Sequence, residues 1–162
     1  SAGEVRLLSV VWGDFDDNGI VDSADVDALV SGIALGGNSP HLDLSGDGKV
    51  NDVDLEQWLA AAAAQNGFAE PFLLGDTNLD GVVNLADLNN LAVNWQRNVT
   101  SWSAGDFTAD GVVDAADLNA LTLNWRQSIP TASVTSAPVP EPSTWLLMLV
   151  GPAMFYRQSR RC

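Results

Sequence analysis

Cysteine, histidine and basic residues are scarce in this chain. Among its 162 residues there is one cysteine, Cys162, so neither an internal disulfide nor a cysteine-based metal cluster can form. The only histidine, His41, lies beside Pro40, where a linker role is favoured over a catalytic one. The sequence has no nucleophile elbow, no paired glutamates and no histidine cluster, so we expect no enzyme within these residues.

Positive charge is low along most of the chain. The 7 Lys and Arg residues stand against 21 Asp and Glu residues, which gives a net charge of −14. Before Glu141 the balance is more acidic still, with 20 carboxylates and 4 bases. Binding to a nucleic-acid backbone requires Lys and Arg, so the composition excludes nucleic acid as a partner and favours cations.

A twelve-residue pattern occurs four times and contains many of the carboxylates. Each copy begins with Asp and places oxygen-bearing side chains at positions 1, 3, 5, 9 and 12, glycine at position 6 and valine at position 8. The oxygen-bearing residues of the first two copies are Asp14, Asp16, Asn18, Asp22 and Asp25, and then Asp43, Ser45, Asp47, Asn51 and Asp54. Those of the third and fourth copies are Asp76, Asn78, Asp80, Asn84 and Asp87, and then Asp106, Thr108, Asp110, Asp114 and Asp117.

This spacing suits a hard cation. Ca²⁺ takes about six to eight oxygen ligands at about 2.3 to 2.6 Å, and a loop that wraps the ion turns alternate side chains inward. Glycine at position 6 permits the sharp turn, and we expect the valine at position 8 to point inward to the paired loop. Position 7 supplies a backbone carbonyl, from Ile20, Lys49, Val82 and Val112. Agreement among four copies favours metal loops over solvated Asp/Gly turns, so we predict up to four Ca²⁺ sites.

The four loops differ in charge. Loops one and four each carry four carboxylates among these side chains, whereas loops two and three carry three, with Ser or Asn in the remaining places. Ligand charge is one determinant of calcium affinity, so we expect loops two and three to be the weaker pair.

An amphipathic helix is predicted after each loop. In the third and fourth repeats the pattern recurs at i, i+3, i+4 and i+7, through Leu88, Leu91, Ala92 and Trp95, and through Leu118, Leu121, Thr122 and Trp125. The first repeat offers Val26, Leu29, Val30 and Ile33, and the second runs from Val53 through Trp58 to Ala64. At this spacing we interpret the tryptophans as core residues.

The segments before loops two and three leave no room for a regular entering helix. Each repeat is therefore a loop followed by one helix, half of an EF-hand, and such a unit buries its apolar face only by pairing. We predict an all-α fold in which repeat one pairs with two and repeat three with four, in two tandem modules over residues 13–68 and 72–128. One joined body of four repeats is the alternative.

The stretch from Gly75 to Leu88 resembles the repeat of the dockerin module of cellulosome-type systems, and the resemblance extends over residues 13–127. It implies binding to a cohesin domain, which would attach a parent protein, often a glycoside hydrolase, to a scaffold. In that family the partner is contacted mainly from loop positions 10 and 11 and from the following helix. Here these positions hold Ser23-Ala24, Asp52-Val53, Leu85-Ala86 and Ala115-Ala116, none of which is the Ser-Thr pair of well-known dockerins.

Two other hypotheses use the same loops. The repeats could form a calcium-rigidified spacer without a cohesin partner, and a search for cohesin domains in the same genome distinguishes the two. A calcium switch of the calmodulin kind is disfavoured, because entering helices and a methionine-rich face are missing: Met148 and Met154 both lie in the tail.

The two ends of the chain differ from the repeats. Residues 1–12 read as a lead-in or the end of an upstream domain, and the opening Ser1-Ala-Gly-Glu leads us to expect a C-terminal piece of a longer protein. From Ser128 the composition turns to Pro, Ser, Thr, Ala and Val, which predicts a disordered stalk with a linker over 129–138.

The tail over residues 139–162 combines Pro140, Glu141 and Pro142 with a short apolar run and closing arginines. It resembles the PEP-CTERM sorting domain. That resemblance implies recognition by a membrane exosortase, transient membrane contact through residues 145–156, and export to the outer surface or extracellular matrix of a bacterium. The apolar run is shorter than the roughly 20 residues that a spanning helix needs.

Overall fold

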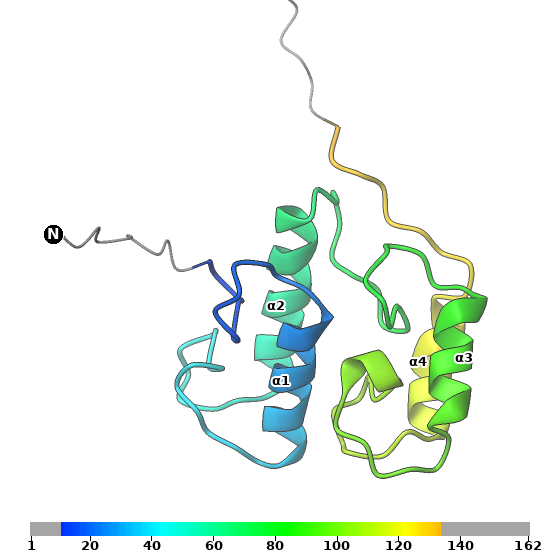
Figure 1. Cartoon of the computed structure of the whole chain (residues 1–162), viewed down its shortest axis with the longest axis horizontal. Helices are drawn as coiled ribbons and strands as arrows, with labels where there is room; N and C mark the ends of the chain where they lie inside the picture. The colour runs from blue at the N-terminus through cyan, green and yellow to red at the C-terminus, as the bar shows by residue number, and fades with distance from the viewer. Residues whose placement is uncertain (1–10, 134–162) are drawn as a thin grey trace, which may run out of the picture. The chain divides into compact units, whose positions relative to one another are not determined.

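A computed structural model describes residues 11–133 of the chain. The residues predicted as the sorting motif, Pro140, Glu141 and Pro142, and the apolar run 145–156 lie outside this range. Within it the fold is all-α, as predicted, and no strand forms beyond three isolated bridges. The elements are α1 (Ser23–Ala34), α2 (Asp52–Gln65), α3 (Leu85–Val93), the short 3₁₀ helix η1 (Trp102–Ala104) and α4 (Ala115–Leu123) (Figure 1).

Every α-helix begins at position 10 of its loop because the loop supplies its cap. In the first repeat the Asp22 carboxylate accepts from the Ala24 N–H at 2.8 Å, and the Asp25 carboxylate accepts from the Asp22 N–H at 2.9 Å. This reciprocal capping box satisfies donors that a helix start leaves unpaired. The same box forms at Asn51, Asn84 and Asp114. Positions 9 and 12 of the calcium-type pattern therefore also determine where each helix starts.

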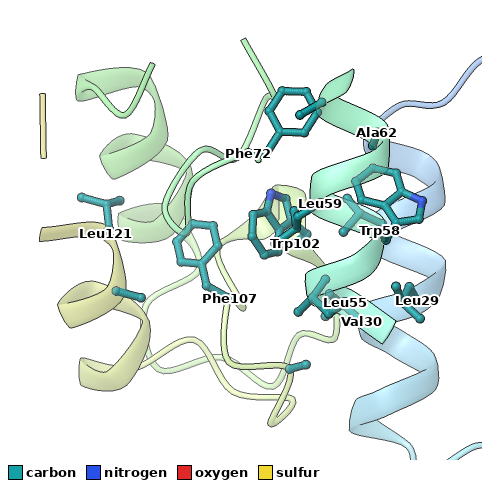
Figure 2. Close-up of a cluster of buried hydrophobic side chains, with 14 of the residues drawn as sticks. Leu29, Val30, Leu55, Trp58, Leu59, Ala62, Phe72, Trp102, Phe107 and Leu121 are labelled. Carbon is teal, nitrogen blue, oxygen red and sulfur yellow. The ribbon is translucent and has the colours of Figure 1, made fainter. Parts of the chain in front are cut away.

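The helices pack in sequential pairs, α1 against α2 and α3 against α4 (Figure 1). In the first pair Leu29 and Val30 of α1 lie beside Leu55 and Trp58 of α2, and Trp58 is fully buried (Figure 2). Burying such a side chain stabilises the fold by about 1.5–3 kcal/mol. The prediction that Trp58 is a core residue is confirmed.

The same prediction is wrong for the tryptophans of the second pair. Trp95 is 39% exposed and Trp125 is 36% exposed. Helix α3 ends at Val93, and the side-chain amide of the capping Asn94 donates to the carbonyls of Asn90 and Ala104. The helix ends two residues before Trp95, the last position of the predicted apolar pattern, so this side chain does not join the buried face of the helix.

The chain leaving the helix of one repeat lies along the loop of the other. Gln96, after α3, donates its N–H to the Val113 carbonyl of loop four at 2.8 Å. Arg126, after α4, donates its N–H to the Val83 carbonyl of loop three at 2.9 Å. Both position-8 valines are fully buried, as expected. Their backbones, however, pair with these exit segments, and among residues 11–133 no backbone hydrogen bond joins loop three to loop four directly.

The first pair has the same reciprocal arrangement, made by asparagine side chains. Asn38, after α1, accepts from the Val50 N–H of loop two at 3.1 Å and donates to the Gly48 carbonyl at 2.9 Å. Asn66, after α2, donates to the Val21 carbonyl of loop one at 3.1 Å. Each helix exit therefore completes the loop of its partner repeat in both halves.

Residues 11–132 belong to one compact unit, so the two halves are joined. Residues 128–132 belong to this unit: Ile129 is buried and donates its N–H to Gly81, and Ala132 donates to the Gly67 carbonyl at 2.7 Å. The prediction that a stalk begins at Ser128 and a linker at residue 129 is wrong for this segment, because Ile129 fills the space beside loop three.

Glycines that precede loops three and four allow a close approach to the opposite helix. Gly75 has φ +107, and a Cβ there would lie 2.7 Å from the Leu121 Cα; Gly105 has φ +105, and a Cβ there would lie 2.9 Å from the Leu91 Cα. Only glycine fits both the backbone conformation and the contact.

We expect Gly75→Ala to lower the free energy of unfolding by about 3 kcal/mol or more, since backbone strain and overlap with α4 add together. Gly46→Ala is the matched control. Gly46 also has positive φ, but nothing lies within 4 Å of its Cβ position, and Ala109 occupies the equivalent place in loop four. The control should cost about 1 kcal/mol. Urea unfolding of both variants checks this, and equal losses would contradict it.

Candidate metal centres

The four loops share one backbone conformation despite their different sequences. The residue at position 4 has φ between 55 and 73°, and the glycine at position 6 has φ between 83 and 87°. The position-4 residues are Asp17, Gly46, Leu79 and Ala109, and the position-6 residues are Gly19, Gly48, Gly81 and Gly111. Three non-glycine residues are thus held in the left-handed region, which costs about 1–3 kcal/mol each and persists only where the surroundings impose it.

Loop one gathers three carboxylates. Asp14, Asp16 and Asp25 each offer a ligand oxygen, these oxygens lie within 4.8 Å of one another, and the group could hold a metal ion. Among residues 11–133 no other set of three Asp, Glu, His or Cys side chains brings its ligand atoms this close together. Position 3 explains the difference, because it is Asp only in loop one; the other loops have Ser45, Asn78 and Thr108 there.

The carboxylate at position 12 closes each loop. Asp25, Asp54, Asp87 and Asp117 are all fully buried. In loop three Asp87 accepts from the Thr77 N–H and Thr77 hydroxyl at 2.8 Å with one oxygen, and from the Asn84 N–H at 2.8 Å with the other. This carboxylate therefore links the start of the loop to its end.

The carboxylate at position 1 accepts a hydrogen bond from the backbone of its own loop. Asp76 and Asp106 are fully buried, and each accepts from the N–H of its position-6 glycine, at 2.8 Å from Gly81 and 3.0 Å from Gly111. The Oδ1 atom of Asp106 is buried and has no hydrogen-bond partner. A buried anionic oxygen without a partner is costly, and a cation bound in the loop would satisfy it. The residues of loop four therefore fit a bound metal ion.

The remaining predicted ligands surround the same loops. The position-5 carboxylates Asp80 and Asp110 accept from the N–H of position 7, each at 2.9 Å, and their side chains are exposed. The Thr108 hydroxyl donates to Asp117 Oδ1 at 3.1 Å, so it lies against the position-12 carboxylate. Three of the four position-7 side chains are exposed, with Ile20 at 60%, and Val112 is half-buried. That exposure agrees with a role for position 7 through its carbonyl.

Burial and like charge shift the acidity of the loop carboxyls. Burial, together with the like charge of a nearby carboxylate, raises the pKa of Asp76 and of Asp106 to about 6; the neighbour is Asp87 for the former and Asp117 for the latter. Burial also raises the pKa of Asp25. At Asp54 burial is outweighed by hydrogen bonds from Ser45 and Asn51, so its pKa lies below the ordinary value.

Two indole groups support the loops, and sequence spacing found only one of them. Trp58 donates its Nε1–H to the Gly13 carbonyl at 2.8 Å, next to the first ligand position of loop one. Trp102 donates to the Asp76 carbonyl at 2.7 Å and is fully buried. It lies in η1, outside any helical periodicity, and its place four residues before Asp106 was the only signal available.

Comparisons with known protein families, with curated proteins and with solved structures find no match to this chain. Within residues 11–133 no helix has the length and apolar character needed to cross a membrane.

The raised pKa values predict how pH affects the protein freed of metal by chelation. Asp76 and Asp106 bind protons more tightly in the folded protein than in the unfolded chain. Their protonation therefore stabilises the fold fully below about pH 4, and this stabilisation of the metal-free protein is lost as pH rises through about 6. Its melting temperature should therefore fall between about pH 4 and 7. A variant with Asp76→Asn and Asp106→Asn should show a flatter profile, and a wild-type melting temperature that rises over this range would contradict the assignment.

Proposed function

We propose that the chain is a calcium-binding, dockerin-like anchoring region of an exported bacterial surface or matrix protein, with one Ca²⁺ in each of the four loops. Catalysis, if the whole protein performs any, belongs to an upstream domain linked to polysaccharide processing. A cohesin-like domain is the partner of the repeats, and an exosortase acts on the tail.

The buried, unpartnered Asp106 Oδ1 is the observation that carries the calcium assignment. Hard oxygen ligands on a loop of this shape suit Ca²⁺ better than the softer transition metals, which favour thiolate and imidazole. The shared φ pattern of the four loops supports extending the assignment from loop four to the others. Loop one adds the trio of carboxylates.

Calcium would act on the fold through the residues that cap the helices. In each repeat the carboxylate at position 12 is both a predicted ligand and a member of the capping box. Neutralising the clustered carboxylates removes their repulsion, so part of the binding energy becomes folding energy.

The proposed binding of a partner is supported by the exposure of loop positions 10 and 11, through which dockerins contact their partners. Leu85 at position 10 of loop three is 70% exposed, and Val53 at position 11 of loop two is 47% exposed. Ala115 and Ala116 are exposed as well. Apolar side chains held outward at the start of a rigid helix suit a protein partner.

Chelation should lower both helix content and thermal stability, because the carboxylates then repel one another. Circular dichroism melts with EDTA and with excess Ca²⁺ measure this. At calcium concentrations about 100-fold above the dissociation constant, each site contributes about 2.7 kcal/mol. Melting curves that EDTA leaves unchanged would refute the proposal, and Mg²⁺ at equal concentration serves as the control for ionic strength.

Asp106→Asn should have opposite effects in the two states. Without metal it removes a buried unpaired charge, so the free energy of unfolding should stay equal or rise. With Ca²⁺ it removes a ligand, so calorimetric titration should show one site fewer or a much weaker one. Asp17→Asn, an exposed change outside the ligand set, should alter neither result. A loss of metal-free stability in Asp106→Asn would contradict the role of this oxygen.

A second candidate, a calcium-rigidified spacer without a cohesin partner, is favoured by the joining of both halves into one compact unit. Pull-down with cohesin domains encoded in the same genome decides between them. The anchoring function predicts calcium-dependent capture that Leu85→Arg, at an exposed contact position, reduces at least about tenfold while leaving calcium binding intact. If calcium binds and no cohesin is captured, the spacer function holds.

A further inference from the structure

One face of α1 is turned away from α2 and toward the second half of the molecule. The Asp27 carboxylate accepts from the Ser103 N–H at 2.8 Å and from the Ser103 hydroxyl at 2.6 Å. One turn further along α1, Ser31 accepts from the Thr100 hydroxyl at 3.2 Å. These contacts join residues more than 65 positions apart in the sequence.

Asp27 is closely linked to loop one although it is not a predicted ligand. It lies two residues after Asp25, on the helix that the capping box of loop one starts. Ordering of loop one therefore fixes the direction in which Asp27 meets Ser103.

On the other side of this contact, η1 touches both loops of the second half. Its Trp102 donates to the carbonyl of Asp76, position 1 of loop three. Asp106, position 1 of loop four, donates its N–H at 3.2 Å to the carbonyl of Ser101, the residue that immediately precedes η1. Trp102 also packs edge-on against Phe107, with ring centroids 5.1 Å apart, and both rings are seen side by side in Figure 2. This one short turn thus supports the first ligand residue of two different loops.

We infer that the Asp27–Ser103 contact couples calcium binding in loop one to calcium binding in loops three and four. The inference rests on the proposed calcium function. Calcium in loop one orders the start of α1, Asp27 holds η1, and η1 positions Asp76 and Asp106. Asp27 is accordingly a positioning residue for sites to which it supplies no ligand. Reciprocity requires that metal in the second half strengthen binding in loop one by the same factor.

The α2 helix offers a matched control. Glu56 stands at the position of α2 that corresponds to Asp27 in α1, two residues after the position-12 carboxylate, and its side chain is exposed. Removing it deletes the same charge at the same sequence distance from a loop. Glu56 lines a cavity with Phe107 and Thr108 of loop four, so this variant also measures the direct effect of a nearby charge on that loop without removing the Asp27–Ser103 hydrogen bonds.

The experiment is a CaCl₂ titration of the ¹⁵N-labelled full chain, followed by NMR at the four position-6 glycines. Each of these N–H groups donates to the position-1 carboxylate of its own loop, so each reports one site. The effect of Asp14→Ala, which disables loop one, is measured on the midpoints of Gly81 and Gly111. The measurement is repeated in Asp27→Ala and Glu56→Ala backgrounds.

In the wild-type and Glu56→Ala backgrounds, we expect Asp14→Ala to raise both midpoints about fivefold or more, at the lower end of usual site-to-site coupling. In Asp27→Ala the midpoints should already be raised, and Asp14→Ala should add nothing. Ser103→Ala, which keeps the backbone donor, is a milder variant and should give a partial loss of coupling.

Two results would overturn the coupling while leaving calcium binding in place. In the first, Asp14→Ala does not change the midpoints at Gly81 and Gly111. In the second, Asp14→Ala changes them equally with and without Asp27. If no glycine N–H responds to CaCl₂ in any variant, the calcium function itself fails and this inference fails with it.

Discussion

The structure depends on one carboxylate per repeat, the aspartate at position 12 of each loop. In loop three this group, Asp87, accepts hydrogen bonds from Thr77 near the loop start and from Asn84 at the helix start. It is buried in all four repeats, where an uncompensated negative charge would be expensive. Hydrogen bonds offset part of that cost, and a bound cation would offset more. Because the same residue closes the loop and caps the helix, a metal ion bound in the loop would also act on the start of the helix.

The arrangement of the loops follows from short helices that end early. Helix α3 stops at Val93, which frees the next residues to lie along loop four, and α4 stops at Leu123 with the same result for loop three. The cost is exposure of Trp95 and Trp125, which a longer helix would have placed on its buried face. Backbone hydrogen bonds with the loops, such as that from Gln96 to Val113, compensate for this exposure. In the first half, where α1 and α2 are longer, Asn38 and Asn66 make the equivalent bonds through their side chains.

The local features could be predicted from the sequence because each has a local cause. The spacing within a single repeat predicts three features: the turn at the position-6 glycine, the helix after each loop and the burial of the position-8 valine. What could not be predicted involves residues distant in sequence. Three features depend on tertiary packing, which sequence periodicity does not predict. They are the contact between Asp27 and Ser103, the burial of Trp102 in η1 and the packing of Ile129 beside loop three. The end of α3 was missed for the same reason, since the bond from Asn94 to Ala104 belongs to tertiary structure.

The segments that follow α3 and α4 also constrain the order in which the loops can fold during synthesis. Val83 of loop three receives its backbone partner from Arg126, which leaves the ribosome more than forty residues later. Until then one edge of that loop faces solvent, and early folding of the third repeat alone would leave it incomplete. The fourth repeat differs, because Gln96 is already present when Val113 emerges. Loop four can therefore form its backbone hydrogen bond with Gln96 as soon as it is synthesised. Loop three can form the equivalent bond only after Arg126 has been synthesised.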